Sequence, residues 1–152
     1  MATALVFVAP VCIESAPAAP SPAQFKRGTV TISQGKRCVI LKVEVASKSA
    51  TRARGLMFRD HLAEGEGMLF IYLRSSPRAF WMKNTYVPLS VAYISSDWRI
   101  NEIRQMDLPV DDRDVPSYPS KEPARYVLEV SQGWFKRNKF TAGARLIYRP
   151  EG

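Results

Sequence analysis

The chain has 152 residues and a net charge of +8, with 46% hydrophobic and 24% charged residues. This length suits one domain with its own core, and 11 prolines and 8 glycines, scattered along the chain, favour short strands over long helices. No apolar run has the length that a transmembrane segment needs. The positive charge favours anionic partners. Because the bases are mixed with acids and form no nucleic-acid motif, we expect no nucleic-acid partner.

The first 25 residues differ from the rest and resemble a signal peptide. Residues 2–13 are almost wholly apolar, and residues 14–22 are rich in Ala, Pro and Ser, with an A-x-A site at Ala16-Pro17-Ala18. The usual positive n-region is missing, so this is either a degenerate signal or one whose true start lies upstream; a disordered tail is the alternative. We expect a periplasmic or secreted protein whose single domain spans residues 26–152.

Beyond residue 26 the pattern predicts an all-β domain, compact and sandwich- or barrel-like, with one short helix. Strands are expected at 29–32, 38–45, 67–73, 79–82, 87–94, 98–106, 126–130 and 144–148. The helix is expected at 49–57, with Ser49 as its N-cap. Residues 107–123 contain four prolines and are expected to form a long irregular loop.

The most distinctive stretch, which we call the signature segment, runs from residue 54 to residue 89. It contains, in order, Arg54-Gly55-Leu56-Met57, Gly67-Met68-Leu69-Phe70, Phe80-Trp81-Met82-Lys83-Asn84-Thr85 and Pro88-Leu89. A buried strand requires β-branched apolar residues, and nothing about burial requires Trp-Met-Lys-Asn-Thr. These motifs therefore carry more information than core patterning does.

The signature segment closely resembles DUF192, a family of small, often exported, uncharacterised bacterial and archaeal proteins. The strand at 43–46 and the later stretch 126–130 with Gly133 extend the resemblance over residues 29–149. It implies an all-β, sandwich-like domain without an established activity. Two positions depart from the family pattern: Ser90 stands where an acidic residue is common after Pro-Leu, and Ala144 stands where Gly-Asp is usual near the end.

The candidate ligand-binding residues are Arg54, Trp81, Asn84 and Thr85. Trp beside Asn and Arg can hold a sugar or planar ligand, because the ring supplies contact area and the amide fixes hydroxyl groups. The competing interpretation, to which the residues alone give more weight, makes Trp81 a core anchor and Asn84-Thr85 a turn. A basic envelope surrounds the segment and favours an anionic ligand: Arg52, Arg54, Arg59, Arg74, Arg78 and Lys83.

Two strand glutamates, Glu44 and Glu129, are the candidate catalytic residues, because a pair of carboxyl groups can perform acid–base chemistry. Strand glutamates more often pair with Arg or Lys across a sheet, and we expect Arg54 to be the partner. The single His, His61, cannot by itself supply a metal site or a Ser-His-Asp site. We therefore expect no cofactor, and the sequence favours binding over catalysis without deciding between them.

A copper(I) site built from Met57, Met68 and Met82 is a further alternative, because thioethers suit that ion. Met is also an ordinary filler of irregular cores, and no M-x-x-M run or supporting His is present. Cys38, the one cysteine after residue 25, is expected to be a small buried residue of its strand.

The sequence thus favours an exported, monomeric, non-catalytic domain that binds a carbohydrate or an anionic cell-envelope ligand. The alternatives are a small acid–base enzyme acting on an envelope polymer, and periplasmic copper(I) handling. A cleft that holds a carboxylate with a strongly raised pKa next to Trp81 would favour the enzyme.

Overall fold

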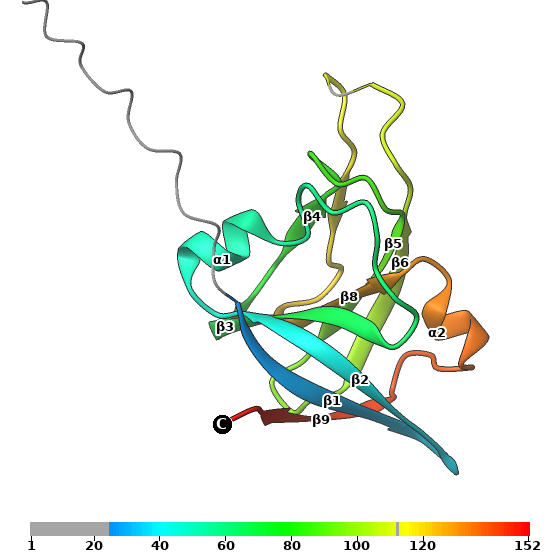
Figure 1. Ribbon diagram of the computed structural model, residues 1–152. Coiled ribbons are helices and arrows are strands. Elements are labelled where there is room, and N and C mark those ends of the chain that lie inside the picture. The colour runs from blue at the N-terminus through cyan, green and yellow to red at the C-terminus, as the bar shows by residue number, and fades with distance from the viewer. Residues whose placement is uncertain (1–24, 112) are drawn as a thin grey trace, which may run out of the picture.

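The computed structural model describes residues 25–111 and 113–152, so the signal-like residues 1–24 lie outside the described part of the chain. The described residues form nine strands and two short helices (Figure 1). The strands are β1 (Lys26–Gln34), β2 (Arg37–Ala46), β3 (Glu66–Ser76), β4 (Ala79–Trp81), β5 (Leu89–Ile94), β6 (Ile100–Met106), β7 (Ser117–Pro119), β8 (Ala124–Ser131) and β9 (Arg145–Pro150). The helices are α1 (Ser49–Arg54) and α2 (Trp134–Arg137). The all-β prediction is confirmed.

Seven strands form one mixed sheet in the order β6-β5-β8-β3-β2-β1-β9, and β4 pairs with β7 in a small second sheet. Among the described strands only β2 and β3 pair in parallel; they are joined through α1 and the first part of the signature segment, residues 55–65. The large sheet curls until its edges approach (Figure 1). They meet at the isolated bridge between Arg99 and Arg145, where the Ile100 amide donates to the Ala144 carbonyl at 2.9 Å. The sheet is therefore strongly curved without being a closed barrel.

Strand alternation divides the core into two clusters, one on each face of the large sheet. The first cluster contains Leu41, Leu69 and Leu128 and is completed by the α2 region through Trp134 and Phe135. The second cluster contains the side chains that alternate with these on β3, β5 and β8: Met68, Phe70, Val91, Tyr93 and Val127. It is covered by Leu56 and Met82 and by the partly buried Phe80 and Tyr118 of the small sheet. The signature segment thus supplies the cover of one face.

Helix α1 is present but begins and ends differently from the prediction. Its N-cap is Lys48, not Ser49. The Thr51 hydroxyl accepts from the Lys48 amide at 3.0 Å and so provides the capping bond from inside the helix. The helix ends at Arg54 because Gly55 adopts φ +47 and ψ −141, a conformation that residues with a side chain avoid.

Three other features differ from the sequence prediction. Helix α2 was not predicted; its four residues are too few to show a 3.6-residue period. The expected loop at 107–123 contains the short strand β7. Cys38 is exposed, because strand alternation places it on the same side of β2 as Ile40, which is 65% exposed.

Within the described residues, the longest helix has six residues, and none has the length and apolar character of a membrane-spanning helix.

Candidate functional site

A pocket of about 210 Å³ lies between α1 and strands β3, β4 and β8. We call it the signature pocket; residues 52–57 and 79–81 line it, together with Phe70, Tyr72, Thr85 and Glu129. Three of the four candidate binding residues, Arg54, Trp81 and Thr85, are therefore brought to one pocket. Glu129, one of the two candidate catalytic residues, lines the same pocket.

The turn after α1 forms one wall of the signature pocket. Glycine is needed here for the backbone, because Gly55 adopts φ +47; a Cβ atom there would lie at an ordinary contact distance, 3.4 Å, from Cζ of Phe70 on the pocket floor. The guanidinium of Arg54 lies 4.4 Å from the ring centroid of Phe58, and among the described residues it forms no ion pair. The expected Arg54 salt bridge to a strand glutamate is wrong, because Arg59 is the residue that reaches Glu44.

Trp81 lies at the pocket mouth with 53% of its surface exposed, so the interpretation of this residue as a core anchor is wrong. Strand alternation on β4 explains this: Phe80 packs against the second core cluster and Trp81 faces the opposite way. The ammonium of Lys83 lies 5.2 Å from the indole centroid. The indole is thus a flat apolar surface flanked by positive charge.

Asn84 does not line the signature pocket, and the turn interpretation fits its backbone. It adopts φ +52, a conformation that Asn tolerates better than most residues. The Thr85 amide donates to the Met82 carbonyl at 3.2 Å, and the Thr85 hydroxyl donates to the Lys83 carbonyl at 3.2 Å. Asn84 therefore shapes the turn that carries Thr85, and its carbonyl accepts from the Phe58 amide across the pocket rim.

Glu129 on β8 is the most unusual residue of the pocket. It is only 4% exposed, and among the described residues its carboxyl group has neither an ion-pair nor a hydrogen-bond partner. Its neighbours in register are the apolar Met68 and Val91. Burial raises the pKa of Glu129 from 4.5 to about 8. At pH 7 the uncharged form of the group therefore predominates.

Tyr72 on β3 brings a phenol to the same pocket, two residues after Phe70 and on the same face. Burial raises the pKa of Tyr72, although nearby Arg78 and Arg52 oppose this shift. Their guanidinium carbons lie 3.6 and 4.9 Å from the Tyr72 ring centroid. Sequence reasoning did not single out Tyr72, but its period-2 spacing from Phe70 was a signal that could have identified it.

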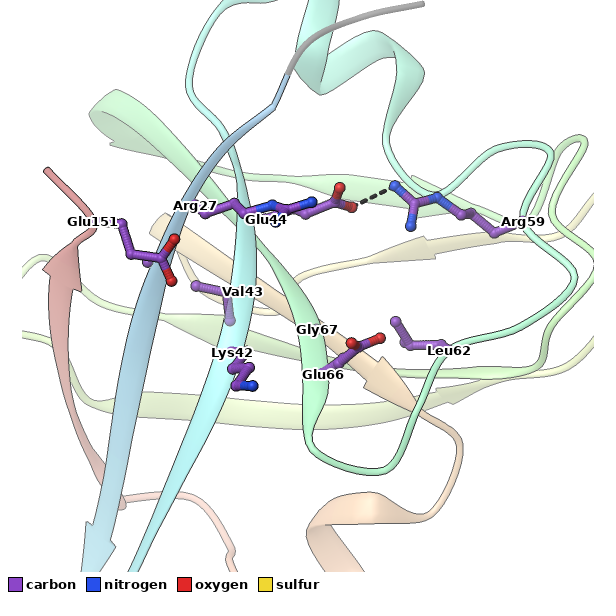
Figure 2. Close-up of a pocket in the computed structure, with 10 residues that line it drawn as sticks. Arg27, Lys42, Val43, Glu44, Arg59, Leu62, Glu66, Gly67 and Glu151 are labelled. Carbon is purple, nitrogen blue, oxygen red and sulfur yellow. Dashed lines mark hydrogen bonds and ion pairs between the residues drawn. The ribbon is translucent and has the colours of Figure 1, made fainter.

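The other candidate glutamate, Glu44, lines a different pocket of about 370 Å³ on β1, β2 and β3. Figure 2 shows its carboxylate paired with the guanidinium of Arg59. Lys42, Glu66 and Glu151 stand around the same hollow, so its wall carries both signs of charge. Glu44 and Glu129 consequently do not form a pair within one pocket.

The three methionines do not converge on either of these pockets. Met68 and Met82 have no exposed surface and belong to the second core cluster, whereas Met57 lines the signature pocket. In the described part of the chain, no group of three His, Cys, Asp or Glu residues could hold a metal ion. Met68 and Met82 act as core residues here, and no specific observation favours copper.

Comparisons with known proteins agree with this fold. The profile of DUF192, described as "Uncharacterized ACR, COG1430", matches residues 30–148. A crystal structure of a "putative transcription regulator" from Sinorhizobium meliloti 1021 is 34% identical with a TM-score of 0.77, covering 84% of this chain and 98% of that chain. A protein of unknown function from Novosphingobium aromaticivorans DSM 12444 is 30% identical with a TM-score of 0.76, covering 88% of this chain and 93% of that chain. No curated protein matches the chain. Because the profile covers most of its length, the protein belongs to DUF192, a family of uncharacterised proteins.

Proposed function

We propose that this protein binds a carbohydrate or an anionic cell-envelope molecule in the signature pocket. The observation that carries the proposal is the exposed indole of Trp81 at the mouth of a pocket that also holds a buried, unpartnered carboxyl group. Sugars are commonly held in this way, by an aromatic surface and a few fixed polar groups. Arg52 and Arg54 on the pocket wall favour ligands with negative charge.

A thermal-shift screen of the purified protein against neutral and acidic saccharides tests this proposal. We expect a saccharide to raise the melting temperature, and Trp81→Ala to abolish that rise while the variant remains folded. Ile40→Ala is the matched control, because Ile40 is an exposed apolar residue on β2, outside the signature pocket. The screen also includes anionic envelope molecules such as phospholipid headgroups, and absence of a shift with every compound would overturn the proposal.

A second candidate function is acid–base catalysis on an envelope polymer, with Glu129 as the general acid. One observation favours it: a carboxyl group with a pKa of about 8 lies in a pocket beside Trp81, as acid catalysis at neutral pH requires. Glu44 is no partner for it, because it lies in the other pocket. Release of reducing ends from an acidic polysaccharide by the protein, lost in Glu129→Gln, would favour catalysis over binding alone.

The name of the Sinorhizobium meliloti protein raises the question of DNA binding. Because the bases of this chain are mixed with acids along its length, we expect no binding to duplex DNA at physiological salt. A fluorescence-anisotropy titration with labelled duplex DNA is the check.

We also propose that the protein is exported, on the basis of the apolar and small-residue pattern of residues 2–22. Mass spectrometry of the protein recovered from a bacterial envelope fraction should then find a chain that starts at Ala19. Recovery of the intact chain from the cytoplasm would contradict export.

A further inference from the structure

We propose that Glu129, as an uncharged carboxylic acid, donates a hydrogen bond to the carboxylate of an acidic sugar held in the signature pocket. This inference rests on the binding function proposed above and names its ligand class. The sugar ring would lie against Trp81, and its carboxylate would lie between Glu129 and the arginines of α1.

The surroundings of Glu129 explain why it acts as a donor. Among the described residues it is the only acidic one that lines the signature pocket, and it is only 4% exposed. Ionisation there would leave an unpaired charge among Met68, Val91 and Phe70, which is costly in free energy. A carboxylic acid kept neutral by apolar surroundings is a strong hydrogen-bond donor to an oxyanion.

The two arginines of α1 favour an anionic ligand over a cationic one. Arg52 and Arg54 line the wall of the pocket, and neither is ion-paired with Glu129. The Arg52 guanidinium is held by the Ile71 carbonyl at 3.2 Å and lies over the Tyr72 ring. A carboxylate placed in this pocket would be attracted by Arg52 and Arg54 and could accept from one neutral donor, whereas an ammonium group would be repelled by the arginines.

The pocket volume of about 210 Å³ limits the ligand to a small unit. Pockets for drug-sized molecules usually have ~300–1,000 Å³, so a single sugar ring with its carboxylate is the appropriate size. The larger pocket around Glu44 lacks the corresponding features. The Glu44 carboxylate is already paired with Arg59, and two further acids, Glu66 and Glu151, line the wall of that pocket.

The charged and titratable groups that line the signature pocket with Glu129, or interact with its charge, come from three elements. Tyr72 on β3 and Tyr93 on β5 are phenols whose pKa values burial raises, so both stay neutral across the pH range of interest. Arg52 and Arg54 on α1 contribute positive charge to the pocket wall. Because burial raises the pKa of Glu129 to about 8, the proposed donor is lost above that pH, and Glu129 then repels an anionic ligand.

Isothermal titration calorimetry at pH 6, 7, 8 and 9 tests the proposal with glucuronic acid, glucose and glucosamine as probes. For the wild type we expect glucuronic acid to bind at least tenfold more tightly than glucose at pH 7. Its affinity should fall by up to tenfold per pH unit above pH 8, with uptake of a proton at pH 9. Glu129→Gln keeps a neutral donor, so its affinity should fall by less than tenfold and become independent of pH. Glu129→Leu should lose at least tenfold at pH 7, and Glu44→Gln should match the wild type.

The outcomes separate the two proposals. Equal or tighter binding of glucose or glucosamine overturns the acidic-sugar inference and leaves the binding function standing. The same decline with pH in Glu129→Gln also overturns it, because Glu129 would then not be the titrating group. If none of these probes or the compounds of the thermal-shift screen binds, the binding function itself fails and the inference with it.

Discussion

Glu44 and Glu129 occupy equivalent places in the sheet but have opposite surroundings. Both are in register with Met68 of β3, Glu44 from β2 and Glu129 from β8. Two strand spacings therefore separate their backbones, about 10 Å. Glu44 lines the hollow in Figure 2 and meets Arg59. Glu129 lines the aromatic-walled signature pocket and meets no charged partner among the described residues.

The difference shows that a strand glutamate acquires its chemistry from the segment that covers it. Residues 54–59 separate the two pockets: Met57 lines one and Arg59 lines the other. The arginine at the end of this segment is available to Glu44 only. An exposed ion pair of this kind stabilises a protein little, whereas a buried unpaired acid lowers its stability whenever it ionises. We therefore interpret Glu44 as a surface ion-pair residue and propose Glu129 as the functional one.

The largest effect is expected for Glu129→Gln at high pH. Below pH 4.5 Glu129 is protonated in both the folded and unfolded states. Between pH 4.5 and about 8 only the folded state keeps the proton, so the stability of the wild type falls with rising pH and levels off above pH 8. The free energy of unfolding of Glu129→Gln should exceed that of the wild type by an amount that grows over this range, to at most about 5 kcal/mol. Urea unfolding of both proteins at pH 5, 7 and 9 measures this difference in the free energy of unfolding. A difference that does not change with pH would contradict the raised pKa of Glu129 in the folded state.

Met68→Ala should have the next largest effect. Met68 has no exposed surface and lies between the two glutamates, so its truncation leaves a cavity in the second core cluster. We expect a loss of about 2–5 kcal/mol in the free energy of unfolding, measured with urea. Met57→Ala, at a half-buried position in the signature pocket, is the control and should cost less. A loss below about 1 kcal/mol for Met68→Ala would show that this residue is not a core residue.

Glu44→Gln should have the smallest effect. The Glu44–Arg59 pair keeps 26% and 39% of its side-chain surfaces exposed, so solvent screens the attraction. We expect a loss of no more than about 1 kcal/mol at pH 7. Thermal unfolding at low and high salt is the measurement, and the loss should shrink at high salt. A loss above about 2 kcal/mol would mean that the pair anchors the signature segment and that the two glutamates differ less than we infer.

The sequence predicted the strands well because their period-2 pattern is local. In β2, Leu41 and Val43 alternate with Lys42 and Glu44, and the structure places them on opposite faces as expected. The turn at Asn84 followed from the residue type in the same way. Such features depend on neighbours in the chain.

The candidate site depended on contacts between distant residues, which the sequence alone did not determine. Nothing local shows that Glu129 comes to face the turn at Gly55, more than 70 positions earlier in the chain. Arg54 was wrongly expected to be the partner of Glu44. Gly55 ends helix α1 and turns the chain, so that Arg59, five residues after Arg54, reaches Glu44 instead. The exposure of Trp81 depended on which face of the short strand β4 packs inward.

The central claim, that the signature pocket holds a neutral carboxylic acid, is tested most directly by ¹³C NMR of the glutamate side-chain carboxyl groups between pH 3 and 10. The Glu129 resonance is assigned by its absence from the spectrum of Glu129→Gln. We predict that it titrates with a midpoint near the raised pKa of about 8. A midpoint close to the ordinary value of 4.5 would show that the acid is charged at neutral pH and would contradict the account.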